Sequence, residues 1–240
     1  MNNIIKDCLF LNEKYKDDFV FTGFDTSQIK KKYKQQRIVT QKGRIYGHEI
    51  LALQVNSSEK LSVSILTDRI YDSLRNDNKI NFMLGNKIFI NVEAYELCNI
   101  QTLKKISEFN KIVDAYGSKL VCEITERNLC HPCTHYHNGL TYLYNNGVTL
   151  AADDYVLFKR DFREEFISKF FKIVKIEVPK LNCKYLLEYE EEVRKISKKN
   201  KIIVFERIET EAQLYFVKNI SKEEDLLQGY IIHHPEIISI

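Results

Sequence analysis

Short apolar runs alternate with amphipathic stretches from about residue 36 onward. Several of the runs are rich in Val and Ile and nearly continuous in apolar residues, which is typical of strands covered on both faces. The eight predicted strands are Arg37–Thr40, Ile45–Leu53, Lys87–Val92, Leu120–Thr125, Val148–Asp153, Ile173–Val178, Lys201–Phe205 and Gln228–Ile232. Apolar residues at helical spacing predict helices over Leu61–Leu74, Thr102–Tyr116 and Tyr185–Lys198.

The order of these elements predicts an α/β fold, an eight-stranded TIM-like β/α barrel. Eight strands with helices between them favour a closed barrel over an open doubly wound sheet, although periodicity alone allows both. The second strand follows the first through only Gln41–Arg44, a connection short enough for a hairpin, so we expect one antiparallel strand. The chain shows no linker and has three prolines, which predicts one domain over residues 1–240. Residues 1–32 are predicted to form an N-terminal extension packed on the barrel.

The composition is that of an ordinary globular protein and does not predict a nucleic-acid or membrane partner. Hydrophobic residues make up 44% of the chain and charged residues 29%, which is ordinary for a soluble globular protein. The net charge of +3 is too weak to predict binding to DNA, RNA or a membrane surface. No apolar run approaches the roughly 20 residues that span a bilayer, and the N-terminus does not resemble a signal peptide. We therefore expect a cytoplasmic protein whose cysteines are reduced.

Charged and amide side chains occur in or beside most of the predicted strands after the first. Such residues are costly inside apolar strands unless something pairs with them. The set is Glu49, Asn91, Glu123, Asp153, Asp154, Lys175, Glu206 and Gln228. Because the carboxyl ends of parallel barrel strands converge on one face, where active sites are found, we expect these side chains to meet in one mouth.

The chemistry of this set favours a metal site. Five carboxylates at close quarters repel one another, and divalent cations relieve that repulsion. Carboxylate and amide oxygens suit Mg²⁺ or Mn²⁺, and two such ions that share a carboxylate suit in-line hydrolysis of a phosphoryl ester. Each residue alone has an ordinary explanation, as a turn or cap residue for the acids and Asn91, or as a lysine that reaches the surface for Lys175. The joint pattern is what favours function.

The same residues fall into a series of short motifs. Gly47–Leu51 resembles G-x-E-A-L, Asn91 stands where N-x-S would begin, Glu123–Glu126 matches E-L/I-T-E, Asp153–Tyr155 resembles D-D-F, Lys175–Glu177 resembles K-I-D, Glu206–Thr210 resembles E-G-V-E-T, and Gln228–Tyr230 with Pro235 matches Q-G-Y/F and a downstream Pro. In this order, and with close to the same spacing over roughly residues 33 to 235, the motifs resemble those of the EAL-domain family.

The resemblance implies an EAL-type barrel that hydrolyses cyclic di-GMP to linear pGpG with two divalent cations, Mg²⁺ or Mn²⁺. The implied ligands are Glu49, Asn91, Glu123 and Asp153 for the first metal, and Asp153 and Asp154 for the second. Lys175 would lie beside the attacking water, Glu206 would act as general base or support that water, and Gln228 would hydrogen-bond within the network. Glu126 would anchor the loop after the fifth strand, and Glu209 would support the site. The resemblance leaves open whether the chain forms a homodimer, since dimers are common in the family but the altered loop touches the surface that they usually share.

Four departures from the family pattern bear on activity. Leu53 replaces an Arg that helps to hold the substrate phosphate, and Tyr155–Asp161 replaces the F-G-x-G-x-S-S loop. Arg207 replaces a Gly and places a cation near the site, where it compensates for Leu53 or blocks substrate, while Glu177 for Asp is a mild change. The complete ligand set favours an active phosphodiesterase. The departures keep open a cyclic di-GMP receptor without turnover and a protein-interaction regulator.

A second group of metal-ligating residue types follows the fourth predicted strand. Cys130, Cys133, His135 and His137 could hold zinc, but four ligands within eight residues are closer together than in most zinc sites. The ordinary explanation is a polar loop that opens the next helix.

Overall fold

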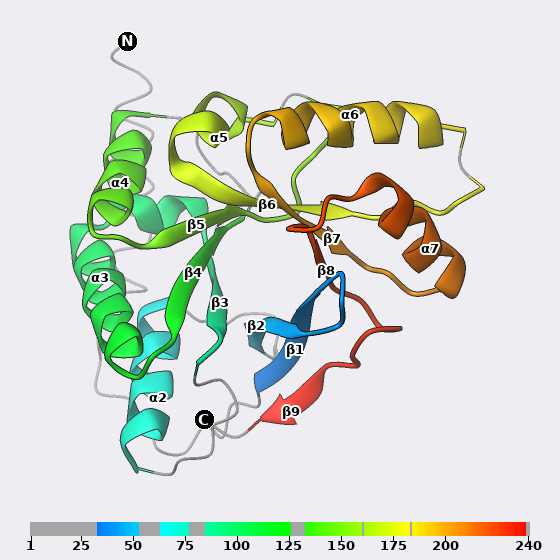
Figure 1. Ribbon diagram of the computed structural model, residues 1–240. Helices are drawn as coiled ribbons and strands as arrows, with labels where there is room; N and C mark the ends of the chain where they lie inside the picture. Colours follow the sequence, from blue (N-terminus) through cyan, green and yellow to red (C-terminus); the bar gives the residue numbers. More distant parts are fainter. Residues whose placement is uncertain are drawn as a thin grey trace.

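Strands and helices alternate along the chain in the computed structural model, which describes residues 33–52, 63–76, 85–125, 133–159, 161–182 and 184–238 (Figure 1). The strands are β1 (Tyr33–Thr40), β2 (Ile45–Ala52), β3 (Lys87–Val92), β4 (Lys119–Ile124), β5 (Thr149–Ala152), β6 (Phe171–Glu177), β7 (Ile202–Glu206), β8 (Leu226–Leu227) and β9 (Glu236–Ile238). The helices are α2 (Val63–Asn76), the short 3₁₀ helix η4 (Ala94–Cys98), α3 (Ile100–Ala115), α4 (Thr134–Asn145), α5 (Glu164–Phe170), α6 (Leu186–Lys198) and α7 (Glu211–Ile220).

Eight of the strands close into a barrel. The strands from β2 to β8 are parallel and follow one another in chain order, and β1 lies between β8 and β2. β1 runs antiparallel to both neighbours, and β9 pairs with it outside the ring. The predicted eight-stranded barrel with an antiparallel strand is therefore confirmed. The predicted hairpin is also confirmed, because β1 and β2 pair directly around the turn at residues 41–44.

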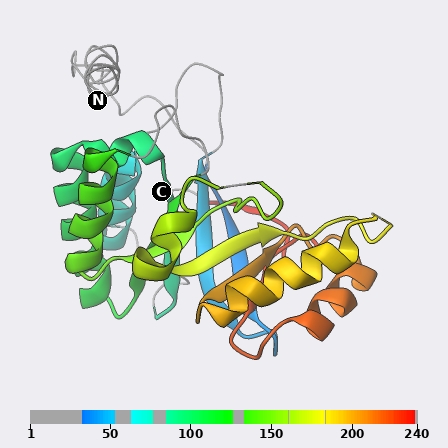
Figure 2. The same cartoon turned by 90° about the horizontal axis from the view of Figure 1, so that it is seen from above.

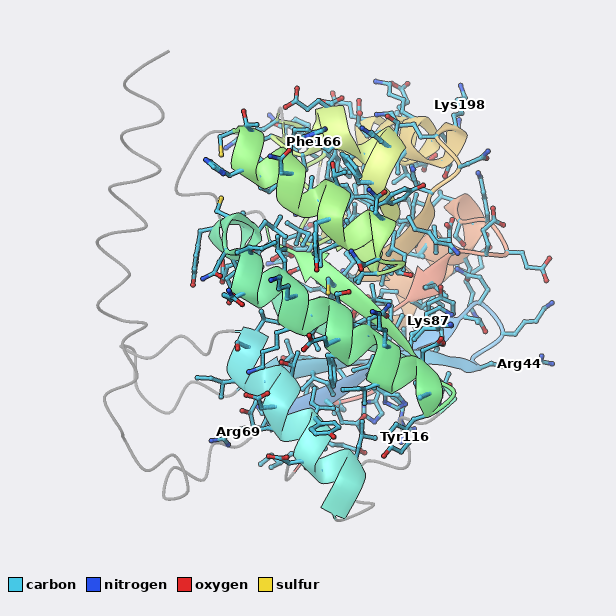
Figure 3. The ribbon with its side chains drawn as sticks, turned by 90° about the vertical axis from the view of Figure 1, so that its left-hand side faces the viewer. Arg44, Arg69, Lys87, Tyr116, Phe166 and Lys198 are labelled. Carbon is cyan, nitrogen blue, oxygen red and sulfur yellow. The ribbon has the colours of Figure 1, made fainter. Side chains whose placement is uncertain are left out.

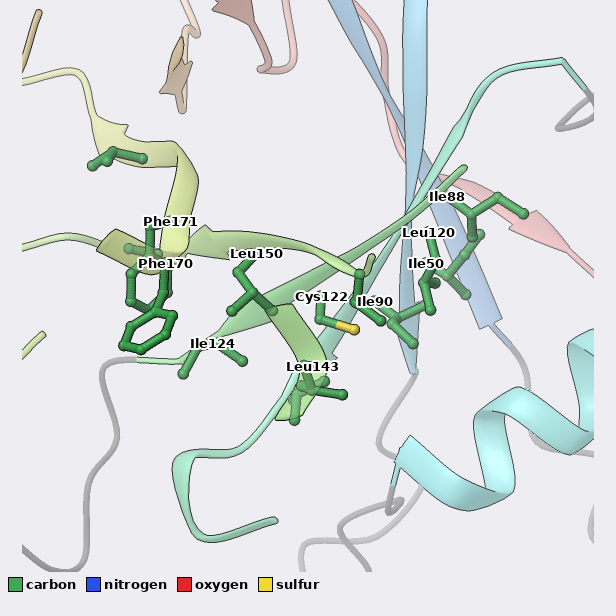
Figure 4. Packing of buried hydrophobic residues seen from close by; sticks show 14 of the residues in the cluster. Ile50, Ile88, Ile90, Leu120, Cys122, Ile124, Leu143, Leu150, Phe170 and Phe171 are labelled. Carbon is green, nitrogen blue, oxygen red and sulfur yellow. The ribbon is translucent and has the colours of Figure 1, made fainter. Parts of the chain in front are cut away.

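The helices lie on the outside of the barrel, where they pack against the parallel strands β3 to β7. Figure 2 shows α3 and α4 on one side of the barrel and α6 and α7 on another, and Figure 3 shows α2, α3 and α4 side by side. Between helices and strands lies the larger core, in which Leu143 of α4 packs with outward-facing strand residues such as Cys122 and Leu150 (Figure 4). Within the described residues, no helix has both the length and the apolar character needed to cross a bilayer.

The eighth predicted strand is the main error in the element boundaries. The strand was expected over Gln228–Ile232, but β8 ends at Leu227 and residues 228–235 form turns and loop before β9. Gly229 accounts for the change, because its backbone packs against Ile208 so closely that a Cβ would lie 2.2 Å from the Ile208 carbonyl oxygen. Gln228 therefore follows β8 and does not open it. The N-terminal extension, residues 1–32, lies outside the described residues, as do Leu53, Glu126 and Cys130.

Candidate active site

Strand alternation places most of the candidate residues in one layer inside the barrel. A small apolar core takes one residue from each of seven strands: Ile38, Phe89, Val121, Ala151, Ile173, Val204 and Leu226. Since successive side chains on a strand point to opposite faces, the residue two positions away returns to the interior. On the parallel strands β3 to β8, or directly after them, these residues are Asn91, Glu123, Asp153, Lys175, Glu206 and Gln228. Together they form a polar layer inside the barrel. The predicted cluster follows from this period of two.

On β2, Gly47 occupies the position of the interior apolar residue, two positions before Glu49. A Cβ at Gly47 would lie 2.6 Å from a ring carbon of Phe89 and 2.7 Å from the Lys87 carbonyl oxygen, so this position has no room for a side chain. Phe89 fills the barrel centre instead, and Glu49, two residues after Gly47, joins the polar layer. Glycine in the G-x-E motif is thus required by the close approach of β2 and β3.

Lys175 lies at the centre of the polar layer and forms ion pairs with four carboxylates. Its Nζ atom is 2.6 Å from Glu123 Oε1, 2.9 Å from Glu206 Oε1, 3.0 Å from Asp153 Oδ1 and 3.3 Å from Glu49 Oε2. The Lys175 side chain is 1% exposed, so water screens these interactions little. Because the carboxylates come from β2, from β4, from β7 and from the turn after β5, only the closed barrel brings them together.

Asp153 and Asp154 follow β5 in a sharp turn that neighbouring strands hold at both ends. The Asp153 amide donates to the Ile124 carbonyl at 3.0 Å, and the Tyr155 amide donates to the Lys175 carbonyl at 2.9 Å. Asp154, between them, has a φ of 44°, which a short acidic residue tolerates better than most. Ligand oxygens of Asp153, Asp154 and Glu206 lie within 4.8 Å of one another. This separation allows three carboxylates to share a cation.

Amide side chains complete the layer, and one of them was missed by sequence reasoning. Gln228 Nε2 donates to Glu49 Oε2 at 2.6 Å and to Gln36 Oε1 at 3.1 Å, and Asn91 Nδ2 lies 3.4 Å from Glu49 Oε1. Gln36 stands on β1 directly opposite Glu49. Because β1 is antiparallel, its residue in the polar layer precedes the interior Ile38 and does not follow it. The register of the predicted hairpin was the signal that could have identified Gln36.

Burial and like charge shift the pKa values of this cluster. Burial, with the nearby Glu49 and Asp153, raises the pKa of Glu123 well above its ordinary value, although Lys175 opposes the shift. Burial also raises the pKa of Glu206 to about 8, again against Lys175 and with Asp153 adding to the effect. The four carboxylates outweigh the effect of burial on Lys175 and raise its pKa, so the ammonium keeps its charge. Burial therefore favours the protonated forms of Glu123 and Glu206 unless further positive charge enters.

The donor set fits hard divalent cations. Buried oxygens remain without a hydrogen-bond donor among the described residues, including Asn91 Oδ1, Glu123 Oε2 and Glu206 Oε2. Unsatisfied buried acceptors of this kind are costly, and a cation satisfies several of them at once. Carboxylate and amide oxygens with no thiolate suit Mg²⁺ or Mn²⁺ better than a structural zinc.

The other candidate residues lie around this layer. Arg207 has a φ of 53°, in the left-handed region that favours glycine, and its Nη1 atom lies 3.4 Å from Glu177 Oε2. Two departures from the family pattern, the last residue of β6 and the first residue after β7, therefore contact each other. Glu209 is exposed just before α7, where its amide donates to Gln213 Oε1 at 3.0 Å. The predicted anchor Glu126 lies outside the described residues.

Cys133, His135 and His137, the described members of the cysteine and histidine group after β4, do not gather with other potential ligands of the described residues, while Cys130 lies outside them. Cys133 precedes α4, and the His137 ring packs at 5.9 Å from the Phe166 ring and 5.5 Å from the Phe170 ring. Phe166 is labelled on α5 beside α4 in Figure 3. Among the residues that the structure describes, only Asp153, Asp154 and Glu206 form a group of three or more potential metal ligands. His137 is a packing residue of the interface between α4 and α5.

Comparison with known proteins identifies the fold. No protein-family model matches this sequence, and no curated protein matches it. Among solved structures, the EAL domain of Mycobacterium smegmatis DcpA is similar, with a TM-score of 0.69 and 19% identity over 85% of this chain and 92% of that one. The PaMucR phosphodiesterase in complex with cyclic di-GMP has a TM-score of 0.66 and 18% identity over 86% and 96% of the two chains.

A third structure extends the similarity to nearly the full length of both chains. The FimX EAL domain from Pseudomonas aeruginosa, bound to cyclic di-GMP, has a TM-score of 0.62 and 14% identity over 96% of each chain. At such low identity, the similarity concerns the arrangement of elements and not the chemistry of individual residues. The chain thus has the fold of EAL domains, which its ordered motifs predicted.

Proposed function

We propose that this protein is a phosphodiesterase that hydrolyses cyclic di-GMP to linear pGpG. The observation that carries the proposal is the cluster of four carboxylates within 3.3 Å of the buried Lys175 ammonium. Two of the similar structures, PaMucR and FimX, contain cyclic di-GMP, which supports this nucleotide as the substrate class. The ordered motifs in the sequence point to the same reaction.

Some residues of the polar layer would bind the two cations, and others would act on the attacking water. Glu49, Asn91, Glu123 and Asp153 would hold one cation, and Asp153 and Asp154 the other. When bound, the two cations supply Lewis acidity at the phosphate and lower the pKa of the attacking water. Gln228 fixes Glu49 through the 2.6 Å hydrogen bond to Oε2 and limits the rotation of that carboxylate.

Lys175 and Glu206 would act on the attacking water. Glu206 has one buried oxygen, Oε2, without a donor among the described residues, and this oxygen is a suitable acceptor for the proton of the water. Lys175 would stabilise the negative charge that develops on the attacking oxygen, an interaction that is strong in a site shielded from water. Both roles need the pair to stay in contact, and their atoms are 2.9 Å apart.

Arg207 is the residue that we assign to the substrate phosphate. Its guanidinium is 61% exposed and follows the proposed base Glu206 directly, so it is free to turn toward a ligand in the mouth. Its partner Glu177 is 56% exposed, and an ion pair with such exposure is weak. A phosphate would compete for Arg207 through paired charge-assisted hydrogen bonds. Five other expectations stay predictions: the supporting role of Glu209, the homodimer, the cytoplasmic location, the use of Mg²⁺ or Mn²⁺, and the lack of DNA or RNA binding.

The first test is turnover of cyclic di-GMP by the purified protein. With Mn²⁺ or Mg²⁺ present, we expect pGpG to accumulate, and we expect Glu49→Ala to lower the rate by about a hundredfold because one cation loses a ligand. The matched control is Glu223→Ala, which removes an exposed carboxylate that pairs with Lys42, and this variant should keep the native rate. Chromatography of the reaction products measures both.

The outcome also separates the alternative functions. The contact of Arg207 with Glu177 favours a receptor, because it places a cation beside the mouth without adding a catalytic group. No turnover with either metal, together with tight binding of cyclic di-GMP, would replace the phosphodiesterase with a receptor. Neither turnover nor binding would leave a protein-interaction regulator.

Metal binding should be tighter at higher pH. The pKa of Glu206 is raised to about 8, so at pH 6.5 a cation must displace a proton, whereas at pH 8.5 the carboxylate is already ionised. We expect the Mn²⁺ affinity to rise by about tenfold for each pH unit and each proton displaced. Calorimetry in two buffers of different ionisation enthalpy counts the released protons. Glu206→Gln is the control and should reduce the dependence without removing it, because burial also raises the pKa of Glu123. An affinity that does not change with pH in the native protein would contradict this account.

A further inference from the structure

We propose that Arg163 is a positioning residue that sets the metal-binding turn at Asp153 and Asp154, an inference that rests on the proposed function of that site. Arg163 stands just before α5, and its side chain is the largest of those that are fully buried among the described residues. Such a buried cation is costly unless each of its donors has a partner. Two of its hydrogen-bond acceptors are backbone carbonyl oxygens at the ends of β4 and β5.

The guanidinium joins the backbone of a proposed metal ligand to the neighbouring strand. Arg163 Nη1 donates to the carbonyl oxygens of Asp153 and Ile124, each at 2.6 Å. Ile124 is the last residue of β4 and follows Glu123, another proposed ligand. The same Ile124 carbonyl also accepts the Asp153 amide at 3.0 Å. One side chain thus fixes the distance between the backbone segments that carry Glu123 and Asp153.

Asp161 holds the guanidinium in place from the other side. Its two carboxylate oxygens accept from Arg163 Nε at 2.9 Å and from Arg163 Nη2 at 2.7 Å, a paired geometry that only arginine provides. Asp161 also accepts the Arg163 amide at 2.9 Å and the Val156 amide at 3.2 Å. The Arg163 guanidinium lies 5.8 Å from the Tyr155 ring centre and 5.6 Å from that of Phe162. The pair therefore ties the segment after the aspartates to the barrel.

This arrangement replaces what a glycine and serine loop would otherwise supply. The segment Tyr155–Asp161 lacks both glycines and both serines of the family loop, and its bulky residues resist the turns that glycine allows. The Asp161–Arg163 pair fixes the segment by charge and hydrogen bonds instead. Groups that orient metal ligands from behind commonly change metal affinity by about 10 to 100-fold when they are removed. Arg163 does not itself face the carboxylate cluster, so we expect its effect to be on metal affinity.

The test measures Mn²⁺ binding by calorimetry with no nucleotide present, and turnover as a function of Mn²⁺ concentration. Arg163→Lys keeps the charge but cannot reach both carbonyls and both oxygens of Asp161. Arg163→Met combined with Asp161→Leu removes the pair without leaving a buried charge, which guards against a variant that fails to fold. Leu143→Ala, a cavity in α4 away from the mouth, is the control for a loss of stability alone.

We expect the Mn²⁺ dissociation constant to rise at least tenfold in both Arg163 variants and to stay unchanged in Leu143→Ala, even where all three lower the Tm. Saturating Mn²⁺ should restore most of the maximal rate, since Arg163 contacts no reacting group. Native affinity in the double variant would overturn the positioning role while the metal site stands. No Mn²⁺ binding by the native protein would overturn the proposed metal site and this role together.

Discussion

Replacement of Lys175 by Met should lower turnover by about a thousandfold and the Tm of the metal-free protein by roughly 10 °C. The ammonium is the single cation in contact with Glu49, Glu123, Asp153 and Glu206 among the described residues, and its loss leaves four carboxylates facing one another. Breaking a buried ion pair by removing one partner costs about 3–5 kcal/mol, and for a chain of this size each kcal/mol shifts the Tm by about 2–4 °C. The rate falls because the ammonium no longer stabilises charge on the attacking oxygen, a loss of about 4 kcal/mol.

Added Mn²⁺ distinguishes this electrostatic effect from a simple packing defect. In Lys175→Met, the cation would take over the neutralisation of the carboxylates, so Mn²⁺ should raise the Tm of the variant more than that of the native protein. Turnover should not return with the Tm, because the cation does not replace the ammonium beside the attacking water. A variant as stable as the native protein without metal would show that the carboxylates are held apart by something other than Lys175. Differential scanning calorimetry with and without chelator makes the comparison.

Asp153→Asn should have the opposite effects on activity and on stability. Asparagine keeps the shape of the side chain and leaves the backbone bonds to Ile124 and Arg163 unchanged, but it removes the charge that both proposed cations share. We expect turnover to fall by about a thousandfold, since stabilisation by a metal is worth several kcal/mol in such reactions. The metal-free protein should become more stable by a few °C, because Asp153 adds to the repulsion that raises the pKa values of Glu123 and Glu206.

Thermal unfolding in chelator and a rate assay in Mn²⁺ test the two halves of this prediction separately. Asp114→Asn is a suitable control, because Asp114 is an exposed carboxylate that pairs with Lys119 at the opposite end of β4 from the site. This control should change neither the rate nor the Tm appreciably. A fall in the Tm of Asp153→Asn would mean that its attraction to Lys175 outweighs the repulsion from the other carboxylates.

The polar layer was predictable from sequence because it follows the simplest periodicity in the fold. Interior residues such as Val121 and Ile173 are apolar, and the charged residue two positions later, Glu123 or Lys175, cannot point anywhere but into the same barrel. The ordered motifs then indicated which fold repeats this pattern on successive strands. The same periodicity did not predict Gln36, because on the antiparallel β1 the polar residue lies two positions before the interior Ile38 and not two positions after it.

The end of β8 and the role of Arg163 were not predictable in the same way. Strand β8 stops where Gly229 meets the Ile208 backbone, a contact between segments that only the folded chain defines. The contacts of Arg163 with strand ends are to carbonyl oxygens, which every residue has, so no residue type at Ile124 or Asp153 reveals them. A buried arginine in a loop also lacks the periodic neighbours that mark a strand or a helix.

Closure of the barrel by β1 has a consequence for the order in which the protein can acquire its site during synthesis. The hydrogen bond between Gln228 and Glu49 joins residues 179 positions apart, and β1 cannot pair with β8 until Leu227 has left the ribosome. Chains emerge at about 5–20 residues per second, so Glu49 waits roughly 9–36 seconds for Gln228. Contacts of such long sequence separation form slowly in general. A nascent chain would therefore carry the carboxylates of Glu49 on β2 and Glu123 on β4 before Lys175 arrives to neutralise them, so the first half of the barrel gains its main counter-charge only when β6 has been made.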